Sequence, residues 1–119
     1  MKFRQIAVPA KDIERAANFY SDFLGAEPLA VFNPPGFAFF DMDGVRLFLD
    51  VNALPGYVYI EVPSVRAKVD ELRSKGIKIT TEPHVVFPDP EGVFDEPGDE
   101  WLAFFEDSEG NQIGLMSRG

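Results

Sequence analysis

Three charged side chains, Arg46, Asp50 and Glu61, are candidates for ligand-binding chemistry, and Glu61 is also a candidate for acid–base chemistry. They share one alternation phase of the expected strands, so they should project from the same kind of sheet face. Two interpretations are open. A buried ion-pair network would fix the shape of a cleft, whereas a carboxylate poised there could abstract a proton or bind a cation. Partial desolvation beside Tyr57 and Tyr59 would let Glu61 serve as an acid or a base.

His84 is the only histidine, and it lies in the proline-flanked segment TEPHVVFPDP. The prolines predict a loop or an edge strand. One imidazole cannot form a cluster within a chain, and a structural or solvent-exposed role competes with a role as general base. The chain contains no cysteine, which excludes a disulfide framework, a thiolate nucleophile and a cysteine-based metal site.

The chain of 119 residues is acidic, with a formal net charge of −9 at pH 7. Nucleic-acid binding depends on clustered Lys and Arg, so this charge argues against a nucleic-acid partner and fits a neutral or cationic one. The alternative is that the carboxylates only keep the protein soluble. No apolar run approaches the roughly 20 residues that span a bilayer, and no leader has the order of a signal peptide. We therefore expect a cytoplasmic protein without a membrane segment.

The end of the chain repeats its beginning. The sequence FAFFDMDGVRLFLD at residues 37–50 returns as LAFFEDSEGNQIGLM at residues 102–116. The parallel extends to QIAVP and YVYIEV, and to helix-like segments 13–25 and 65–76, each of which ends in glycine. Each half predicts the order βαβββ. We expect one α+β domain built from repeat 1 (residues 1–53) and repeat 2 (residues 54–119).

One alternation phase of the expected strands is purely apolar and should pack beneath the helices. It comprises Ile6, Val8, Leu47, Leu49, Val58, Ile60, Ile113 and Leu115. The helices carry matching stripes with spacings of three and four. The stripes are Ile13, Ala16, Ala17, Tyr20, Phe23 and Leu24, then Val65, Val69 and Leu72. Asp12 and Ser64 are predicted N-caps, and Gly25 and Gly76 suit the left-handed position after the last turn.

The opposite phase is mixed in character. It comprises Gln5, Ala7, Arg46, Phe48, Asp50, Tyr57, Tyr59, Glu61, Gln112, Gly114 and Met116. In an antiparallel sheet such a face is usually solvated. Two curved modules that face one another would instead enclose it, and the face would then line a cleft.

The opening IAVPAKDIERAANFYSDFLGAEP resembles that of the vicinal oxygen chelate superfamily, the group of glyoxalases, bleomycin-resistance proteins and extradiol dioxygenases. The matching positions are Asp12, Ile13, Ala16, Phe19, Tyr20, Leu24 and Gly25, with Asp107, Gly110 and Asn111 at the close. The resemblance covers essentially the whole chain and implies paired βαβββ modules that form a curved mixed sheet with a cleft. It implies less about function, because the superfamily includes lyases, isomerases, oxygenases and proteins that only sequester antibiotics.

The resemblance places the family's divalent-metal ligands at Gln5, Phe48, Tyr57 and Gly114, none of which is His, Asp or Glu. A catalytic divalent metal requires about three imidazole or carboxylate donors. We therefore expect no metal cofactor. The aromatic replacements predict that an apolar or stacked ligand occupies the space.

Residues 88–100, PDPEGVFDEPGDE, predict a long irregular segment that is either a functional lid or simply mobile. Phe87, Phe94 and Trp101 flank or lie in it. Together with the surrounding carboxylates they would suit a cationic, partly aromatic ligand. The alternative is that these rings only anchor the loop.

The leading hypothesis is a metal-independent protein that binds or sequesters a small hydrophobic or cationic aromatic molecule, and that acts as a homodimer. Its expected ligand-binding residues are Gln5, Arg46, Phe48, Asp50, Tyr57, Tyr59, Glu61, Trp101 and Gly114. A second hypothesis is a lyase or dioxygenase that recruits Glu61, Asp50 or His84 as unusual metal ligands. A third is a structural or regulatory protein with a vestigial cleft.

Overall fold

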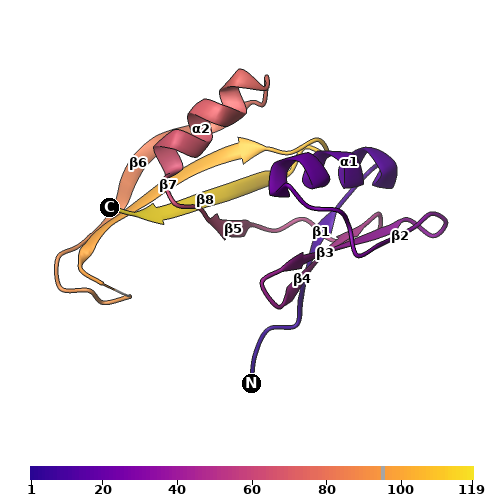
Figure 1. Cartoon of the computed structure of the whole chain (residues 1–119), viewed down its shortest axis with the longest axis horizontal. Helices are drawn as coiled ribbons and strands as arrows, with labels where there is room; N and C mark the ends of the chain where they lie inside the picture. Colours follow the sequence, from indigo (N-terminus) through magenta and orange to yellow (C-terminus); the bar gives the residue numbers. More distant parts are fainter. Residues whose placement is uncertain (95) are drawn as a thin grey trace. The chain divides into compact units, whose positions relative to one another are not determined.

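The computed structural model describes residues 1–94 and 96–119, and its backbone contacts divide the chain into two units (Figure 1). Unit 1 contains residues 1–56 and 108–111, and unit 2 contains residues 57–107 and 112–119. The elements of unit 1 are β1 (Gln5–Pro9), α1 (Ile13–Leu24), β2 (Ala30–Phe32), β3 (Phe37–Met42) and β4 (Val45–Asp50). Those of unit 2 are β5 (Val58–Glu61), α2 (Val65–Ser74), β6 (Ile79–Asp89), β7 (Gly98–Glu106) and β8 (Gln112–Arg118).

The two units have the same topology. The strand orders are β1-β4-β3-β2 and β5-β8-β7-β6. In each sheet the strand that comes first in the chain pairs in parallel with the strand that comes last, and the remaining pairs are antiparallel. The helix follows the first strand and leads to the strand at the opposite edge of the sheet, so the chain crosses the sheet before it returns. The predicted α+β class and the two βαβββ modules are confirmed.

Each helix begins and ends as its sequence predicts. The side chain of Asp12 accepts a hydrogen bond from the amide of Arg15, and that of Ser64 accepts one from the amide of Ala67. Gly25 ends α1 with φ of 65°, and Gly76 follows the C-cap of α2 with φ of 77°, in the left-handed region that glycine tolerates.

The core of each unit lies between its helix and one sheet face. In unit 1 the apolar stripe of α1 packs on the buried residues Val8, Ala38, Phe40, Leu47 and Leu49. In unit 2 the buried stripe of α2 covers Ala103, Phe105, Ile113 and Leu115, and Figure 1 shows α2 lying across this sheet. The predicted apolar phase is confirmed at these positions, but Ile6 is 41% exposed.

A carboxylate from the second repeat completes unit 1. The β7–β8 turn, Ser108–Asn111, belongs to unit 1, where the buried Glu109 lies at the N-terminus of α1. Glu109 Oε1 accepts hydrogen bonds from the amides of Lys11 (2.7 Å) and Asp12 (2.8 Å), and Oε2 accepts one from Arg15 Nε (2.8 Å). The side-chain amide of Asn111 donates to the Pro9 carbonyl at 2.7 Å. The first helix therefore depends on a loop that lies more than eighty residues later in the chain.

The segment between β6 and β7 is shorter than predicted. Residues 88–100 do not form one irregular loop, because β6 continues to Asp89 and β7 begins at Gly98, with Pro88 opposite Asp99 and Asp89 opposite Gly98. Within the part of the chain that the structure describes, no helix is long and apolar enough to cross a membrane.

Candidate functional site

The face of the unit 1 sheet opposite α1 is lined by phenylalanines. Phe48 of β4 is opposite Phe39 of β3, and their rings are stacked with centroids 4.7 Å apart and planes 2° apart. Phe37 meets both rings edge-on, and Phe32 meets Phe39 in the same way. Four rings from three strands thus form a continuous apolar surface on this face.

A pocket of about 450 Å³ lies on this aromatic surface, which places it within the size range of small-molecule sites. Its lining comprises Gln5, Leu29, Ala30, Phe39, Arg46 and Phe48. Arg46 is its one charged lining residue, and Arg46 Nε donates a hydrogen bond to Gln5 Oε1 at 2.9 Å. Gln5 and Arg46 are direct neighbours across β1 and β4, so the sheet register holds this contact.

The equivalent face of unit 2 reverses the sizes of two neighbouring residues. In unit 1 the small Ala7 lies beside the large Phe48, whereas in unit 2 the large Tyr59 lies beside Gly114. A Cβ atom at position 114 would be 2.6 Å from Tyr59 Cδ2 and 3.2 Å from Phe104 Cε1. Tyr59 therefore covers the space that a side chain at position 114 would fill, and its ring contacts Phe104 at 5.7 Å.

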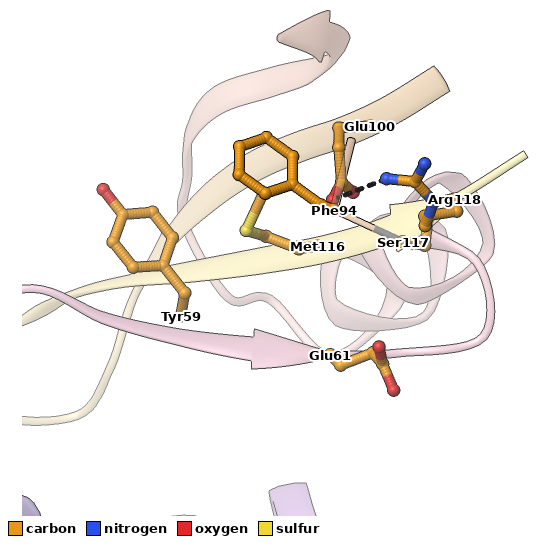
Figure 2. A pocket seen from close by; sticks show the side chains of 7 residues that line it. All are labelled: Tyr59, Glu61, Phe94, Glu100, Met116, Ser117 and Arg118. Carbon is orange, nitrogen blue, oxygen red and sulfur yellow. Dashed lines mark ion pairs between the residues drawn. The ribbon is translucent and has the colours of Figure 1, made fainter. Parts of the chain in front are cut away.

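A second pocket, of about 290 Å³, lies in unit 2 (Figure 2). Its lining comprises Tyr59, Glu61, Phe94, Glu100, Met116, Ser117 and Arg118. Figure 2 shows Tyr59, Met116 and Phe94 gathered along β8, with Glu61 at the end of β5. Glu61 is exposed at the rim, and among the described residues it has no ion-pair partner.

An ion network supports this pocket. Arg118 pairs with the buried Asp89 (Nη2 to Oδ2, 2.7 Å) and with Glu100 (Nη1 to Oε1, 2.9 Å; Figure 2). Asp89 also accepts hydrogen bonds from the amides of Val93 (2.7 Å) and Phe94 (3.3 Å). The hydrogen bond from Val93, with those from Arg118 and Phe94, lowers the pKa of Asp89 against the opposing effect of burial. Asp89 thereby fixes the backbone that carries Phe94, which packs edge-on against Phe87 at 5.4 Å.

The charged groups in and around this pocket sum to a net negative charge. One guanidinium, that of Arg118, lies among the carboxylates of Asp89, Glu100 and Glu61. Two of these carboxylates share the arginine, and Glu61 adds a further negative charge at the rim. A cation with an apolar body would be attracted by these carboxylates and by the faces of Tyr59 and Phe94.

The four positions at which the family resemblance places metal ligands do not fit a divalent metal. Gln5 already accepts a hydrogen bond from Arg46, Phe48 is stacked on Phe39, and position 114 has no side chain and lies under Tyr59. Tyr57 is 70% exposed and contacts Phe104. Over residues 1–94 and 96–119 no three His, Asp or Glu side chains are grouped as metal ligands. This donor set is not one that Zn²⁺ or Fe²⁺ prefers.

Three other predicted site residues lie outside both pockets. Trp101 is opposite Ser117, whose hydroxyl accepts a hydrogen bond from the first amide of α2, so Trp101 lies on the helix side of its sheet. Its ring lies under the guanidinium of Arg66 at 4.3 Å, and it does not belong to the lining of the unit 2 pocket that contains Tyr59. The Asp50 carboxylate accepts a hydrogen bond from the amide of Asn52. His84 is exposed on the edge strand β6, as predicted, with Nδ1 2.9 Å from the Glu82 carbonyl oxygen.

The sequence analysis missed several lining residues: Leu29, Ala30, Phe39, Glu100, Ser117 and Arg118. A signal was present for Phe39, which is aromatic and belongs to the repeated motif that also contains Phe104. Arg118 carried no signal, because its partner Asp89 is 29 residues away along the chain.

Comparison with known proteins agrees with this fold. A family model described as the Glyoxalase/Bleomycin resistance protein/Dioxygenase superfamily matches residues 2–115, so the chain belongs to this superfamily. A glyoxylase-like domain-containing protein of Didymella fabae is 29% identical over 130 residues, which cover 95% of this chain and 91% of the relative.

Solved structures of the superfamily share the fold. A member from Sphaerobacter thermophilus gives a TM-score of 0.71 at 19% identity, over 98% of this chain and 96% of that chain. A lactoylglutathione lyase from Agrobacterium tumefaciens gives 0.69 at 20% identity, over 97% and 92%. At these identities the likeness concerns the fold alone.

Proposed function

We propose that this protein binds a small hydrophobic cation in the unit 2 pocket without a metal, and that it acts by binding or sequestering this molecule. The observation that carries the proposal is the combination of an apolar wall, formed by Tyr59, Phe94 and Met116, with the unpaired carboxylate of Glu61. Apolar surface supplies affinity, and a carboxylate beside aromatic faces selects positive charge. Members of the superfamily that sequester antibiotics offer a precedent for such a role.

The same geometry supports the proposal that binding needs no metal. The alternative, a metal-dependent lyase or dioxygenase with non-standard ligands, requires that Glu61, Asp50 or His84 join a group of donors. Asp50 belongs to unit 1, whereas Glu61 and His84 belong to unit 2. Among the described residues, no three His, Asp or Glu side chains are grouped as metal ligands. Elemental analysis of protein purified without chelators separates the two hypotheses, because a stoichiometric divalent metal would support the enzyme.

Isothermal titration calorimetry with benzyltrimethylammonium tests the proposal. We expect saturable binding by EDTA-treated protein and weaker binding of benzyl alcohol, which has the ring without the charge. The variants Glu61→Gln and Tyr59→Leu should each weaken binding by roughly two- to fivefold, the size of an exposed cation–π or ion contact. Glu27→Gln is the matched control, since Glu27 is exposed in unit 1. Equal affinity for the charged and uncharged probes would contradict the proposal.

We further propose that the chain works in the cytoplasm as a homodimer. The absence of cysteine fits a reducing compartment. The edge strand β6 presents Val85, Val86 and Phe87, each 36–46% exposed, and closed twofold dimers are the commonest oligomers. Light scattering tests this, because a particle of one 13.3 kDa chain at micromolar concentration would contradict it.

A further inference from the structure

The unit 1 pocket has the opposite charge character from the unit 2 pocket. Its walls are apolar, from Phe39, Phe48, Leu29 and Ala30, and among the residues that the structure describes no carboxylate lines it. Its one charged lining residue is Arg46. We infer that this pocket binds a planar aromatic monocarboxylate, whose ring lies on the phenylalanine surface and whose carboxylate binds Arg46.

The geometry of Arg46 suits an anion. Gln5 accepts a hydrogen bond from Nε of Arg46 and so orients the guanidinium group. The two terminal nitrogens of the guanidinium can then donate hydrogen bonds to a ligand. Bidentate arginine–carboxylate pairs are stronger and more directional than lysine pairs, because the planar fork matches the carboxylate.

No protein carboxylate competes for this guanidinium within the described part of unit 1. Asp41 is the cross-strand neighbour of Arg46, but its Oδ1 accepts a hydrogen bond from the amide of Gly44 in the β3–β4 turn. Asp50, at the other end of β4, is engaged by the amide of Asn52. The described ion pairs of the chain do not include Arg46.

The ring surface sets the shape of the ligand. The rings of Phe39 and Phe48 are stacked almost in parallel, and the ring of Phe37 makes edge-to-face contacts with both. Such a cluster accepts a further ring by offset stacking or by edge-to-face contact. A fused bicyclic acid such as 2-naphthoate has a suitable size for a pocket of about 450 Å³.

Calorimetric titration with 2-naphthoate tests this inference, with 2-naphthamide as the uncharged probe of the same shape. We expect 2-naphthoate to bind at least roughly tenfold more tightly than the amide, since a charge-assisted bidentate contact is made only by the acid. Arg46→Gln should abolish this preference, and Arg46→Lys should retain only part of it. Arg4→Gln removes the same charge from an exposed neighbouring residue outside the pocket lining and should leave the preference unchanged.

Two results would overturn the inference: equal binding of acid and amide, or a preference that survives Arg46→Gln. Amide chemical shifts give an independent readout, because 2-naphthoate should perturb Gln5, Phe39 and Phe48. Perturbations centred on Tyr59 and Met116 would instead contradict binding of 2-naphthoate in the unit 1 pocket. Benzyltrimethylammonium binding by Arg46→Gln should match that of the unaltered protein, so this inference can fail while the proposed cation site stands.

Discussion

The ring of Tyr59 covers the backbone of Gly114, and a Cβ atom at position 114 would lie only 2.6 Å from Tyr59 Cδ2. The two residues are neighbours across the parallel strands β5 and β8. At the equivalent place in unit 1, Ala7 is small and Phe48 is large. The two repeats thus place an aromatic ring on the equivalent sheet face from opposite members of the pair.

This size relationship predicts the effect of Gly114→Ala. The added methyl group would force the Tyr59 ring outward, because the contact at 2.6 Å is too short for carbon atoms. Since Tyr59 is 52% exposed, its ring can partly yield, and we expect a loss of about 1–2 kcal/mol in the free energy of unfolding. Urea denaturation measures this loss.

Gly56→Ala is the matched control, because nothing lies within 4 Å of a Cβ atom there. Its effect should stay within about 0.5 kcal/mol. The pair exchange Tyr59→Ala with Gly114→Phe, which copies unit 1, should be more stable than Gly114→Phe alone. An unchanged stability of Gly114→Ala would show that Tyr59 does not occupy this space.

Glu109 makes the stability of the chain depend on pH. Burial alone would raise the pKa of Glu109, but hydrogen bonds from Arg15, Ser108 and the amides of Asp12 and Lys11 outweigh it and lower the pKa to about 2. Because this pKa is below that of the unfolded chain, about 4.5, the carboxylate stabilises the fold fully above pH 4.5. The contribution is lost as the pH falls from about 4.5 toward 2.

Glu109→Gln should therefore lower the free energy of unfolding at pH 7 by about 1–3 kcal/mol and flatten its decline between pH 5 and 3. Urea denaturation at several pH values gives both quantities. Part of the decline should remain, because the pKa of Asp89 is lowered as well. Glu27→Gln, at an exposed position, should leave the curve unchanged. A pH profile identical in Glu109→Gln and the unaltered protein would contradict this role.

Asp89 should position Phe94 for ligand binding. In Asp89→Asn the ion pair with Arg118 is lost and the amides of Val93 and Phe94 face a weaker acceptor. We expect a lower urea midpoint and roughly tenfold weaker binding of benzyltrimethylammonium, by loss of charge-assisted hydrogen bonds. Phe94→Leu is the comparison variant, since it should weaken binding while the urea midpoint changes little. Unaltered binding by Asp89→Asn would exclude the positioning role.

Trp101 reports on the helix side of its sheet. It is the only tryptophan, and its ring lies under Arg66 rather than in the unit 2 pocket. Saturation with benzyltrimethylammonium should therefore leave its fluorescence maximum unchanged, whereas Arg66→Ala should shift it. Strong quenching of the Trp101 fluorescence by the probe in the unaltered protein would indicate that the probe binds beside Trp101 and would contradict this placement.

The fold could be predicted because its signals are local. The apolar alternation and the caps Asp12 and Ser64 involve residues within a few positions of one another, and the repeated motif is visible when the two halves of the sequence are compared directly. For Trp101 the sequence holds a signal for the helix side, since this residue shares its alternation phase with the buried residues Ala103 and Phe105. Its size and the neighbouring acidic segment favoured a ligand-binding interpretation.

The residues that sequence reasoning missed depend on distant partners. Glu109 occurs in a polar turn, where a carboxylate is usually solvated, yet it binds the amide of Lys11 from 98 residues away. Asp89 and Arg118 are also far apart in the sequence, and they can pair only because the register of β6, β7 and β8 brings them together. Spacing along the chain cannot show such contacts, because the register is set by the packing of the whole sheet.

The most direct test of metal-independent cation binding is a titration of EDTA-treated, ¹⁵N-labelled protein with benzyltrimethylammonium, followed by amide chemical shifts. We predict saturable shifts centred on Tyr59, Glu61, Phe94 and Met116, with the same dissociation constant before and after addition of Zn²⁺ or Mn²⁺. Shifts that are absent at millimolar probe, or that appear only when a divalent metal is added, would contradict the proposed function.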